Sequence, residues 1–353
     1  MNPVCNFPRI PVQELSMCVP PSFPAGSLKS GAQRVRGVDV KEKVLVVIGA
    51  TGTGKSRLAI DVARSFRGEV VNSDKMQVYY GLDIVTNKVT AEERSAVPHH
   101  LLGVIPPRDD FTAPDFRREA AAAVDEILSR GRLPIIAGGS NSFVEELIEG
   151  GGREFLSRRE CCFLWVDVRL PVLHRSVAER VDRMVEKGMV EEVRSAFDPD
   201  DSDYSRGIRR AIGMPELDQY MRTAGLLGEA ERERILREAV AEIKANTRRL
   251  TLHQLEKIRR LTQAYGWDVH RVEATEAVRR KGEAAAEAWE EAVAKRSFEI
   301  VRRFLEVGDG KRELKEKKKK MNGLGNKSVV MGFGEGEEEF AGKSLAAVVG
   351  VTV

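Results

Sequence analysis

The chain has 353 residues, of which 42% are apolar, and its formal net charge at pH 7 is only +3. This length is enough for one large α/β domain with a helical insertion, or for two domains. The small net charge argues against a molecule that binds nucleic acid through its overall field. No apolar run is long enough to cross a bilayer, so we expect a soluble protein without a membrane partner.

The cysteine pattern excludes a disulfide-stabilised fold. The four cysteines are Cys5, Cys18 and the adjacent pair Cys161 and Cys162. Neighbouring residues in a strand point to opposite faces, so this pair cannot easily form a disulfide. The spacing does not match a zinc site either. We therefore expect a reducing compartment.

Residues 1–40 are basic and poor in acidic residues, of which there are only Glu14 and Asp39. This composition fits an organelle transit peptide, and the alternative is an ordinary disordered extension. A secretory signal does not fit, because no continuous apolar core follows the basic residues.

A glycine-rich loop between a strand and a helix is the strongest signal in the chain. Residues 43–48 predict a buried strand and residues 55–66 predict an amphipathic helix. Backbone N–H groups of such a loop can surround a diphosphate, a lysine adds positive charge, and a serine hydroxyl can bind Mg²⁺. The alternative, a turn that binds nothing, is disfavoured by the flanking strand and helix. The loop consists of Gly49, Ala50, Thr51, Gly52, Thr53, Gly54, Lys55 and Ser56.

The next predicted strand, residues 69–74, ends in polar residues, the last of which is Asp74. Ligands of open parallel sheets bind beyond the carboxyl ends of the strands, so Gly49 and Asp74 should face one cleft. A second glycine turn follows at residues 138–142, where Ser140 or Asn141 can cap a helix. The other elements predicted here are a helix at 114–130, a strand at 133–137, a surface loop at 149–160 and a buried strand at 161–168.

Helices dominate the remainder of the sequence. They are predicted at residues 171–187, 189–197, 229–265 and 275–305, without strands between the last two. We therefore predict an α/β fold, with a P-loop NTPase-like parallel sheet flanked by helices and an additional helical subdomain. The expected organisation is a disordered leader at 1–40, a P-loop core at 41–170, a mainly helical region at 171–306 and a disordered tail at 307–353.

Residues alone leave the chemistry of the cleft open. A P-loop that binds a nucleoside triphosphate normally works with a metal-binding acid at a strand end. Asp167 could take that role, or it could pair with Arg169 or Arg183. Asp74 could accept a proton from a nucleophile, or it could cap a short helix. His99 and His100 lack metal-ligand spacing and favour a structural or hydrogen-bonding role.

Several motifs occur in the order found in one known family. After the P-loop come Asn72-Ser73-Asp74-Lys75-Met76-Gln77-Val78-Tyr79, residues 83–88, residues 99–103 and the second glycine turn. Together they resemble the isopentenyltransferases that modify N6 of adenine. Residues 165–168, 179–184, 188–193, 206–213 and 243–250 are similar to the plant adenylate branch, the cytokinin synthases.

The resemblance implies that dimethylallyl diphosphate supplies a five-carbon group to N6 of AMP, ADP or ATP. Mg²⁺ and the P-loop would stabilise the departing diphosphate. Asp74 would be the base, because an adenine amine is a poor nucleophile that must lose a proton as it attacks. We expect a monomer in the plastid (chloroplast), with the cytoplasm as the alternative.

Further roles are implied by the same resemblance. Lys244, which the resemblance assigns to the nucleotide side, could instead lie on a solvated helix face. The stretch 251–254 departs from the family pattern, in which an arginine commonly precedes Gln254. The implied assignments are Thr53, Lys55, Ser56 and Ser140 to the diphosphate or its metal, Arg210 or Arg209 to charge neutralisation, and Arg180, Asp182 and Lys244 to the nucleotide side.

Three rival functions are open at this point. The tRNA branch of the family shares the main motifs, but its eukaryotic members usually carry a C-terminal zinc finger, and no cysteine follows Cys162. A small-molecule kinase would use the P-loop for ATP and release ADP. A nucleotide-binding interaction module would catalyse nothing.

Overall fold

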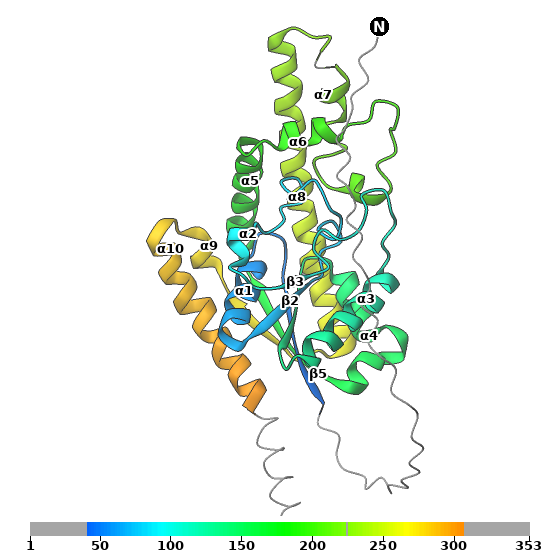
Figure 1. Cartoon of the computed structure of the whole chain (residues 1–353). Coiled ribbons are helices and arrows are strands. Elements are labelled where there is room, and N and C mark those ends of the chain that lie inside the picture. The colour runs from blue at the N-terminus through cyan, green and yellow to red at the C-terminus, as the bar shows by residue number, and fades with distance from the viewer. Residues whose placement is uncertain (1–40, 224, 307–353) are drawn as a thin grey trace, which may run out of the picture. The chain divides into compact units, whose positions relative to one another are not determined.

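A parallel β-sheet forms the centre of the computed structural model, which describes residues 41–223 and 225–306 (Figure 1). The leader and the tail expected at residues 1–40 and 307–353 lie outside the described residues. The order of strands is β3-β2-β4-β1-β5-β6, and all neighbouring pairs are parallel. The strands are β1 (Glu42–Ile48), β2 (Gly68–Asn72), β3 (His99–His100), β4 (Leu133–Ala137), β5 (Arg159–Asp167) and β6 (Val269–Glu273).

Helices cover both faces of the sheet, which explains the continuous apolar run of β1. Val44, Val46 and Ile48 join one buried cluster, beneath α3, α4 and α8. Leu45 and Val47 join the other, beneath α1. The helices are α1 (Lys55–Phe66), α2 (Ala91–Arg94), α3 (Ala113–Ser129), α4 (Asn141–Arg158), α5 (Leu170–Glu186), α6 (Met189–Ala196), α7 (Asp218–Thr223), α8 (Glu229–Tyr265), α9 (Thr275–Arg279) and α10 (Gly282–Trp289).

The prediction of a P-loop-type parallel sheet flanked by helices is confirmed. The helix predicted at 55–66 and the long helix predicted at 229–265 match α1 and α8 residue for residue. Figure 1 shows α8 extending from the sheet towards α6 and α7. In the described part of the chain, no helix combines the length and apolar character needed to cross a membrane.

Three local predictions were wrong. The region after residue 170 contains a strand, β6, which sequence patterning missed because only one of its five residues, Val272, is buried. Residues 149–160 are not one loop: α4 resumes after a kink at Gly150–Arg153, and β5 begins at Arg159. Residues 275–305 are not one helix, because α9 ends at Arg279 and α10 continues into a π-helical turn at Glu290–Ala294.

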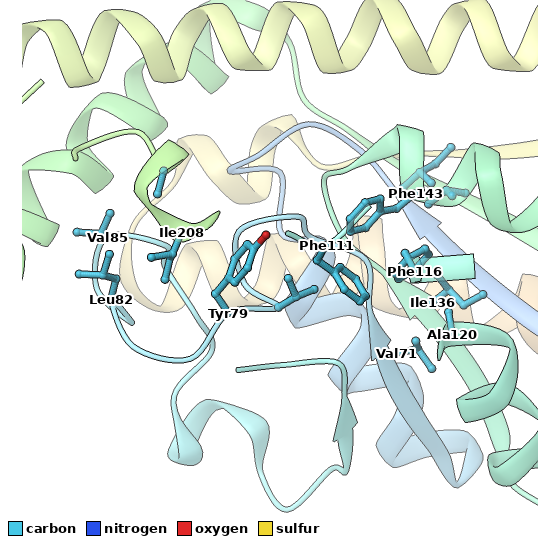
Figure 2. Packing of buried hydrophobic residues seen from close by; sticks show 14 of the residues in the cluster. Val71, Tyr79, Leu82, Val85, Phe111, Phe116, Ala120, Ile136, Phe143 and Ile208 are labelled. Carbon is cyan, nitrogen blue, oxygen red and sulfur yellow. The ribbon is translucent and has the colours of Figure 1, made fainter. Parts of the chain in front are cut away.

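A buried tyrosine anchors the segment that follows β2. Tyr79 is fully buried and belongs to the same cluster as Leu82, Val85 and Ile208 (Figure 2). In that cluster Phe116 stacks on Phe143, with 4.5 Å between the ring centroids. This packing fixes the segment that follows Asp74 in the chain, at the carboxyl end of the sheet.

Candidate active site

A cleft of about 990 Å³ opens at the carboxyl ends of the strands. It lies between the P-loop, the segment after β2, the second glycine turn and α5. Cations outnumber acids along its wall, so its chemistry suits an anionic ligand. The charged residues that line it are Lys55, Arg57, Arg64, Lys88, Arg94, Arg180, Arg183 and Lys187, with Asp61, Asp74, Asp83 and Glu93 as the acids.

The P-loop folds around the Ala50 carbonyl, which accepts hydrogen bonds from Thr53 Oγ1 at 2.9 Å and Lys55 Nζ at 2.7 Å. Burial lowers the pKa of Lys55 to about 8, and the charge of Asp74 opposes that shift. Gly49 has φ of +154°, and a Cβ there would lie 2.5 Å from the Val166 carbonyl oxygen. The loop therefore requires glycine where it leaves β1.

Ser56 is exposed and lines the cleft beside Lys55. The described residues contain no group of three or more His, Cys, Asp or Glu side chains that could hold a metal. A single hydroxyl is nevertheless compatible with Mg²⁺, which is commonly bound by few protein ligands together with substrate phosphates and water. The residues present therefore fit a metal that is carried mainly by a diphosphate.

Asp74 uses its two carboxylate oxygens differently. Oδ1 accepts backbone N–H bonds from Met76 at 2.9 Å and Gln77 at 3.4 Å, which is the capping role that the sequence left open. Oδ2 lies 3.4 Å from the position that a Cβ would take on Gly139. Asp74 lines the cleft, and its charge acts on both Lys55 and Arg180. The prediction was that Gly49 and Asp74 face one cleft. Asp74 does share a cleft with P-loop residues, including Lys55 and Ser56, although Gly49 itself does not line it.

Arg180 brings α5 onto the P-loop. Its Nη2 donates to Thr51 Oγ1 at 3.0 Å, and it lines the cleft. Burial lowers the pKa of Arg180 to about 10, while the carboxylate of Asp74 opposes this shift. Its Nε is buried without a hydrogen-bond partner among the residues that the structure describes.

Asp182 and Lys244 form an ion pair between α5 and α8, with 2.5 Å between Oδ1 and Nζ. Neither residue lines the cleft. The pairing explains why Lys244 is only half-exposed on a helix whose face would otherwise be solvated. A direct contact of either residue with a nucleotide stays a prediction.

Ser140 Oγ accepts the backbone N–H of Lys75 at 2.7 Å, which ties the second glycine turn to the residue after Asp74. Arg209 donates to the carbonyls of Asp203 and Asp201 and stacks on a tyrosine ring. Arg210 instead donates to Tyr79 Oη at 3.1 Å. Burial lowers the pKa of Lys75, and the charge of Arg210 adds to that shift. Of the two arginines, Arg210 is therefore the one directed towards the Asp74 segment.

Other candidates have structural partners. Asp167 pairs with Arg271 at 2.6 Å, and not with Arg169 or Arg183. His99 hydrogen-bonds the Val97 carbonyl at 2.9 Å. His100 Nε2 lies 2.7 Å from a Glu69 carboxylate oxygen. The hydrogen-bonding role predicted for the histidines matches these contacts, whereas the metal-binding option for Asp167 has no support from its surroundings.

Sequence reasoning missed two residues at the site. Gln254 on α8 hydrogen-bonds both glycine turns, and Trp289 of α10 packs against Gly54 of the P-loop. The glutamine belonged to a stretch that was noted only for its departure from a pattern. No pattern in the sequence predicted the contact of the tryptophan with the P-loop, because that contact depends on where the C-terminal helices lie in the fold.

The parallel sheet, the P-loop and the basic cleft above it define a P-loop α/β protein. The sequence model of the family "IPP transferase" matches residues 77–160 and 152–261. The chain belongs to this family. It is therefore an isopentenyltransferase, and the resemblance on which the sequence prediction depended is confirmed.

Several similar proteins come from plants. "Adenylate isopentenyltransferase 5, chloroplastic" of Arabidopsis thaliana is 57% identical, over 76% of this chain and 82% of its own length. "Adenylate isopentenyltransferase" of Humulus lupulus is 46% identical, over 74% and 89%. "Adenylate isopentenyltransferase 7, mitochondrial" of Arabidopsis thaliana is 50% identical, over 75% and 80%.

Solved structures share the fold at lower identity. A eukaryotic dimethylallyltransferase acting on tRNA superposes with a TM-score of 0.62 at 22% identity, over 75% of this chain and 80% of that one. The tRNA isopentenylpyrophosphate transferase of Bacillus halodurans superposes with a TM-score of 0.59 at 24% identity, over 78% and 100%. At these identities the likeness extends to the fold alone.

Proposed function

We propose that this chain transfers the dimethylallyl group of dimethylallyl diphosphate to N6 of AMP, ADP or ATP, with release of diphosphate, as a step in cytokinin biosynthesis. The observation that carries the proposal is the Asp74 carboxylate, which faces Lys55 and Arg180 across one cleft. The names of the plant relatives support adenylate as the acceptor.

The transfer joins N6 of adenine to C1 of the dimethylallyl group while the bond from C1 to the diphosphate oxygen breaks. The amine gains positive character as it attacks and must lose one proton. Asp74 Oδ2 is the acceptor for that proton, since Oδ1 is engaged by the Met76 and Gln77 amides. Protonated Asp74 and free diphosphate are the remaining products.

The leaving diphosphate gathers negative charge, which the P-loop side of the cleft is built to oppose. Two cations supply the charge and donors: Lys55, whose ammonium group donates to the Ala50 carbonyl, and Arg180, whose Nε has no hydrogen-bond partner in the described part of the chain. Thr53 and Ser140 complete the proposed contacts, and Arg210 neutralises charge from the Tyr79 side. Ser56 would hold Mg²⁺, which when bound supplies charge neutralisation to the diphosphate oxygens.

The proposal includes the class of molecule that accepts the prenyl group. We infer adenine mononucleotides rather than tRNA because the relatives at high identity are named for adenylate, whereas the tRNA enzymes are similar at 22–24% identity. The pair Asp182 and Lys244 is the candidate for the nucleotide side. Arg180, which the resemblance also assigned to that side, contacts Thr51 of the P-loop and is therefore proposed for the diphosphate instead. A monomeric state is a prediction, to be checked by light scattering.

We infer a plastid location from the basic composition of residues 1–40 and from relatives named chloroplastic, although one is named mitochondrial. A fluorescent fusion to the full chain in plant cells tests this. Co-localisation with chlorophyll supports it, and a cytoplasmic or mitochondrial signal contradicts it.

Mass spectrometry of the reaction products tests the function. The full chain is incubated with Mg²⁺, dimethylallyl diphosphate and, in separate reactions, AMP, ADP, ATP or an anticodon stem-loop RNA. A five-carbon mass increment on a mononucleotide with release of diphosphate is expected. Prenylation of the RNA alone would establish the tRNA activity, release of ADP from ATP would establish a kinase, and no turnover of any kind would leave a binding module.

A further inference from the structure

Gln254 of α8 lies between the two glycine turns of the site. Its side-chain Oε1 accepts the backbone N–H of Thr51 at 2.8 Å. Its Nε2 donates to the Gly139 carbonyl oxygen at 2.9 Å. One amide group therefore joins the P-loop to the turn after β4, although the three segments are far apart in the sequence.

The position of Gln254 is itself fixed. Its backbone carbonyl accepts a hydrogen bond from Asn141 Nδ2 at 3.1 Å, so α8 is tied to the start of α4. A Cβ on Gly139 would lie 2.7 Å from Gln254 Nε2, which shows how closely the amide approaches the turn. The geometry leaves little freedom for a different side chain.

Each end of the bridge continues to a group with a proposed role. Thr51 Oγ1 accepts from Arg180, on the diphosphate side of the cleft. Gly139 adjoins Oδ2 of Asp74, on the side of the base. Gln254 does not line the cleft, so any effect on the reaction passes through Thr51 and Gly139.

We propose that Gln254 is a positioning residue that holds the P-loop and the Asp74 side of the cleft at the separation which prenyl transfer requires. This inference rests on the proposed function of the site. Proton transfer and departure of the diphosphate must occur in one geometry, and small displacements of reacting groups slow such steps strongly.

The bridge needs one acceptor and one donor, which defines a sharp test. In Gln254→Glu an ionised carboxylate can still accept from Thr51 N–H but has no proton to donate to the Gly139 carbonyl. A protonated glutamic acid restores both bonds at almost the same size. Charged groups adjoin both segments that Gln254 joins: Arg180 donates to Thr51, Asp74 Oδ2 adjoins Gly139, and the charge of Asp74 acts on Lys55. The next turn of α8 carries Lys257, which pairs with Glu145 at 2.8 Å.

The experiment compares the wild-type chain with Q254E from about pH 5.5 to about pH 8.5, the range over which a glutamate in this setting can change its charge. The matched control is Q263E, the same chemical change at an exposed position of α8. We expect kcat of Q254E to be at least about tenfold below wild type at pH 8.5, with KM changed less, and the ratio to recover as the pH falls. Q263E should follow the wild type throughout.

Two further measurements keep the test decisive. Q254N is neutral but too short to reach both turns, so its kcat should be low at every pH without recovery. The affinity of each variant for Mg²⁺-diphosphate, measured by calorimetry, should show a smaller loss than kcat but the same dependence on pH, and this readout does not depend on turnover. A wild type that binds diphosphate but transfers no prenyl group would count against the proposed function alone.

The inference is overturned if Q254E matches the wild type in kcat and in diphosphate affinity at pH 8.5. It is equally overturned if its deficit does not change with pH and equals that of Q254N, because a loss of packing alone is not repaired by a proton. Thermal unfolding at each pH separates these results from unfolding of the variant.

Discussion

Asp74 Oδ1 accepts the backbone N–H of Met76 at 2.9 Å, so a carboxylate that lines the cleft is also the cap of the turn that follows it. Capping fixes the side chain and leaves Oδ2 towards Gly139, in a cleft that Lys55 and Arg180 also line. One oxygen is structural and the other is available for chemistry. This division explains how a short turn after β2 can present a base without a supporting histidine.

The first prediction follows from that division. Asp74→Asn keeps an oxygen that can cap Met76 but cannot take up a proton, so prenyl transfer should fall about 10²–10⁴-fold while diphosphate still binds. Asp74→Ala also loses the cap and should unfold with about 1 kcal/mol less stability. Steady-state kinetics and urea unfolding check both variants. Normal turnover by Asp74→Asn would falsify the assignment of the base.

The second prediction concerns pH and Lys55. Burial holds the pKa of Lys55 at about 8 in the free protein, so its ammonium charge is present below that pH and is lost as the pH rises through it. In the proposed function, that charge binds the diphosphate of the donor. KM for dimethylallyl diphosphate should therefore be flat below pH 8 and rise above it, approaching tenfold per pH unit.

Lys55→Met is the control for that profile. This variant should bind dimethylallyl diphosphate weakly. Its KM should not begin to rise near pH 8, apart from any change that ionisation of the substrate itself causes. A rise of the same size in this variant would show that another group titrates there.

The P-loop and its flanking elements could be predicted from the sequence because they depend on local patterns. A buried apolar strand, glycines at set positions and the amphipathic α1 are all readable within residues 43–66. Asp74 was also found locally, since it ends a strand in a sheet whose ligands bind at that edge. Its partners could be named only through the family resemblance.

What sequence reasoning missed depends on contacts between distant segments. β6 is an edge strand with a single buried residue, so its pairing with β5 has no hydrophobic signature. Arg271 could not be foreseen as the partner of Asp167, because β6 places it there. Gln254 looked like part of an ordinary helix, since hydrogen bonds to two loop backbones leave no periodicity in α8.

The third prediction separates the two interpretations of Lys244. The pair with Asp182 is partly exposed, so it should contribute at most about 1 kcal/mol to stability. Lys244→Met should raise KM for ADP at least about fivefold if the ammonium group also meets a nucleotide phosphate, as charge-assisted contacts of this kind imply. The swap Asp182→Lys with Lys244→Asp should restore stability but not KM. Recovery of both would make the pair purely structural.

The fourth prediction concerns Trp289, whose ring packs against the P-loop. A Cβ on Gly54 would lie 2.6 Å from Trp289 Cζ3, and the Arg57 guanidinium lies 4.4 Å from the ring centroid. The indole N–H donates to Asp61 at 2.8 Å. The end of α10, where the π-helical turn begins, therefore packs against Gly54 and Arg57 and holds them in place.

Trp289→Ala should lower stability by about 3–5 kcal/mol and, because Gly54 and Arg57 lose their support, should also weaken diphosphate binding. Trp267→Ala is the matched control. That indole also donates to a carboxylate, Glu149 at 2.7 Å, and stacks on Phe163, and Trp267 does not line the cleft. Both variants should unfold at lower urea concentration, but only Trp289→Ala should lose diphosphate affinity by calorimetry. Equal losses of affinity in the two variants would mean that general destabilisation, rather than support of the P-loop, is responsible.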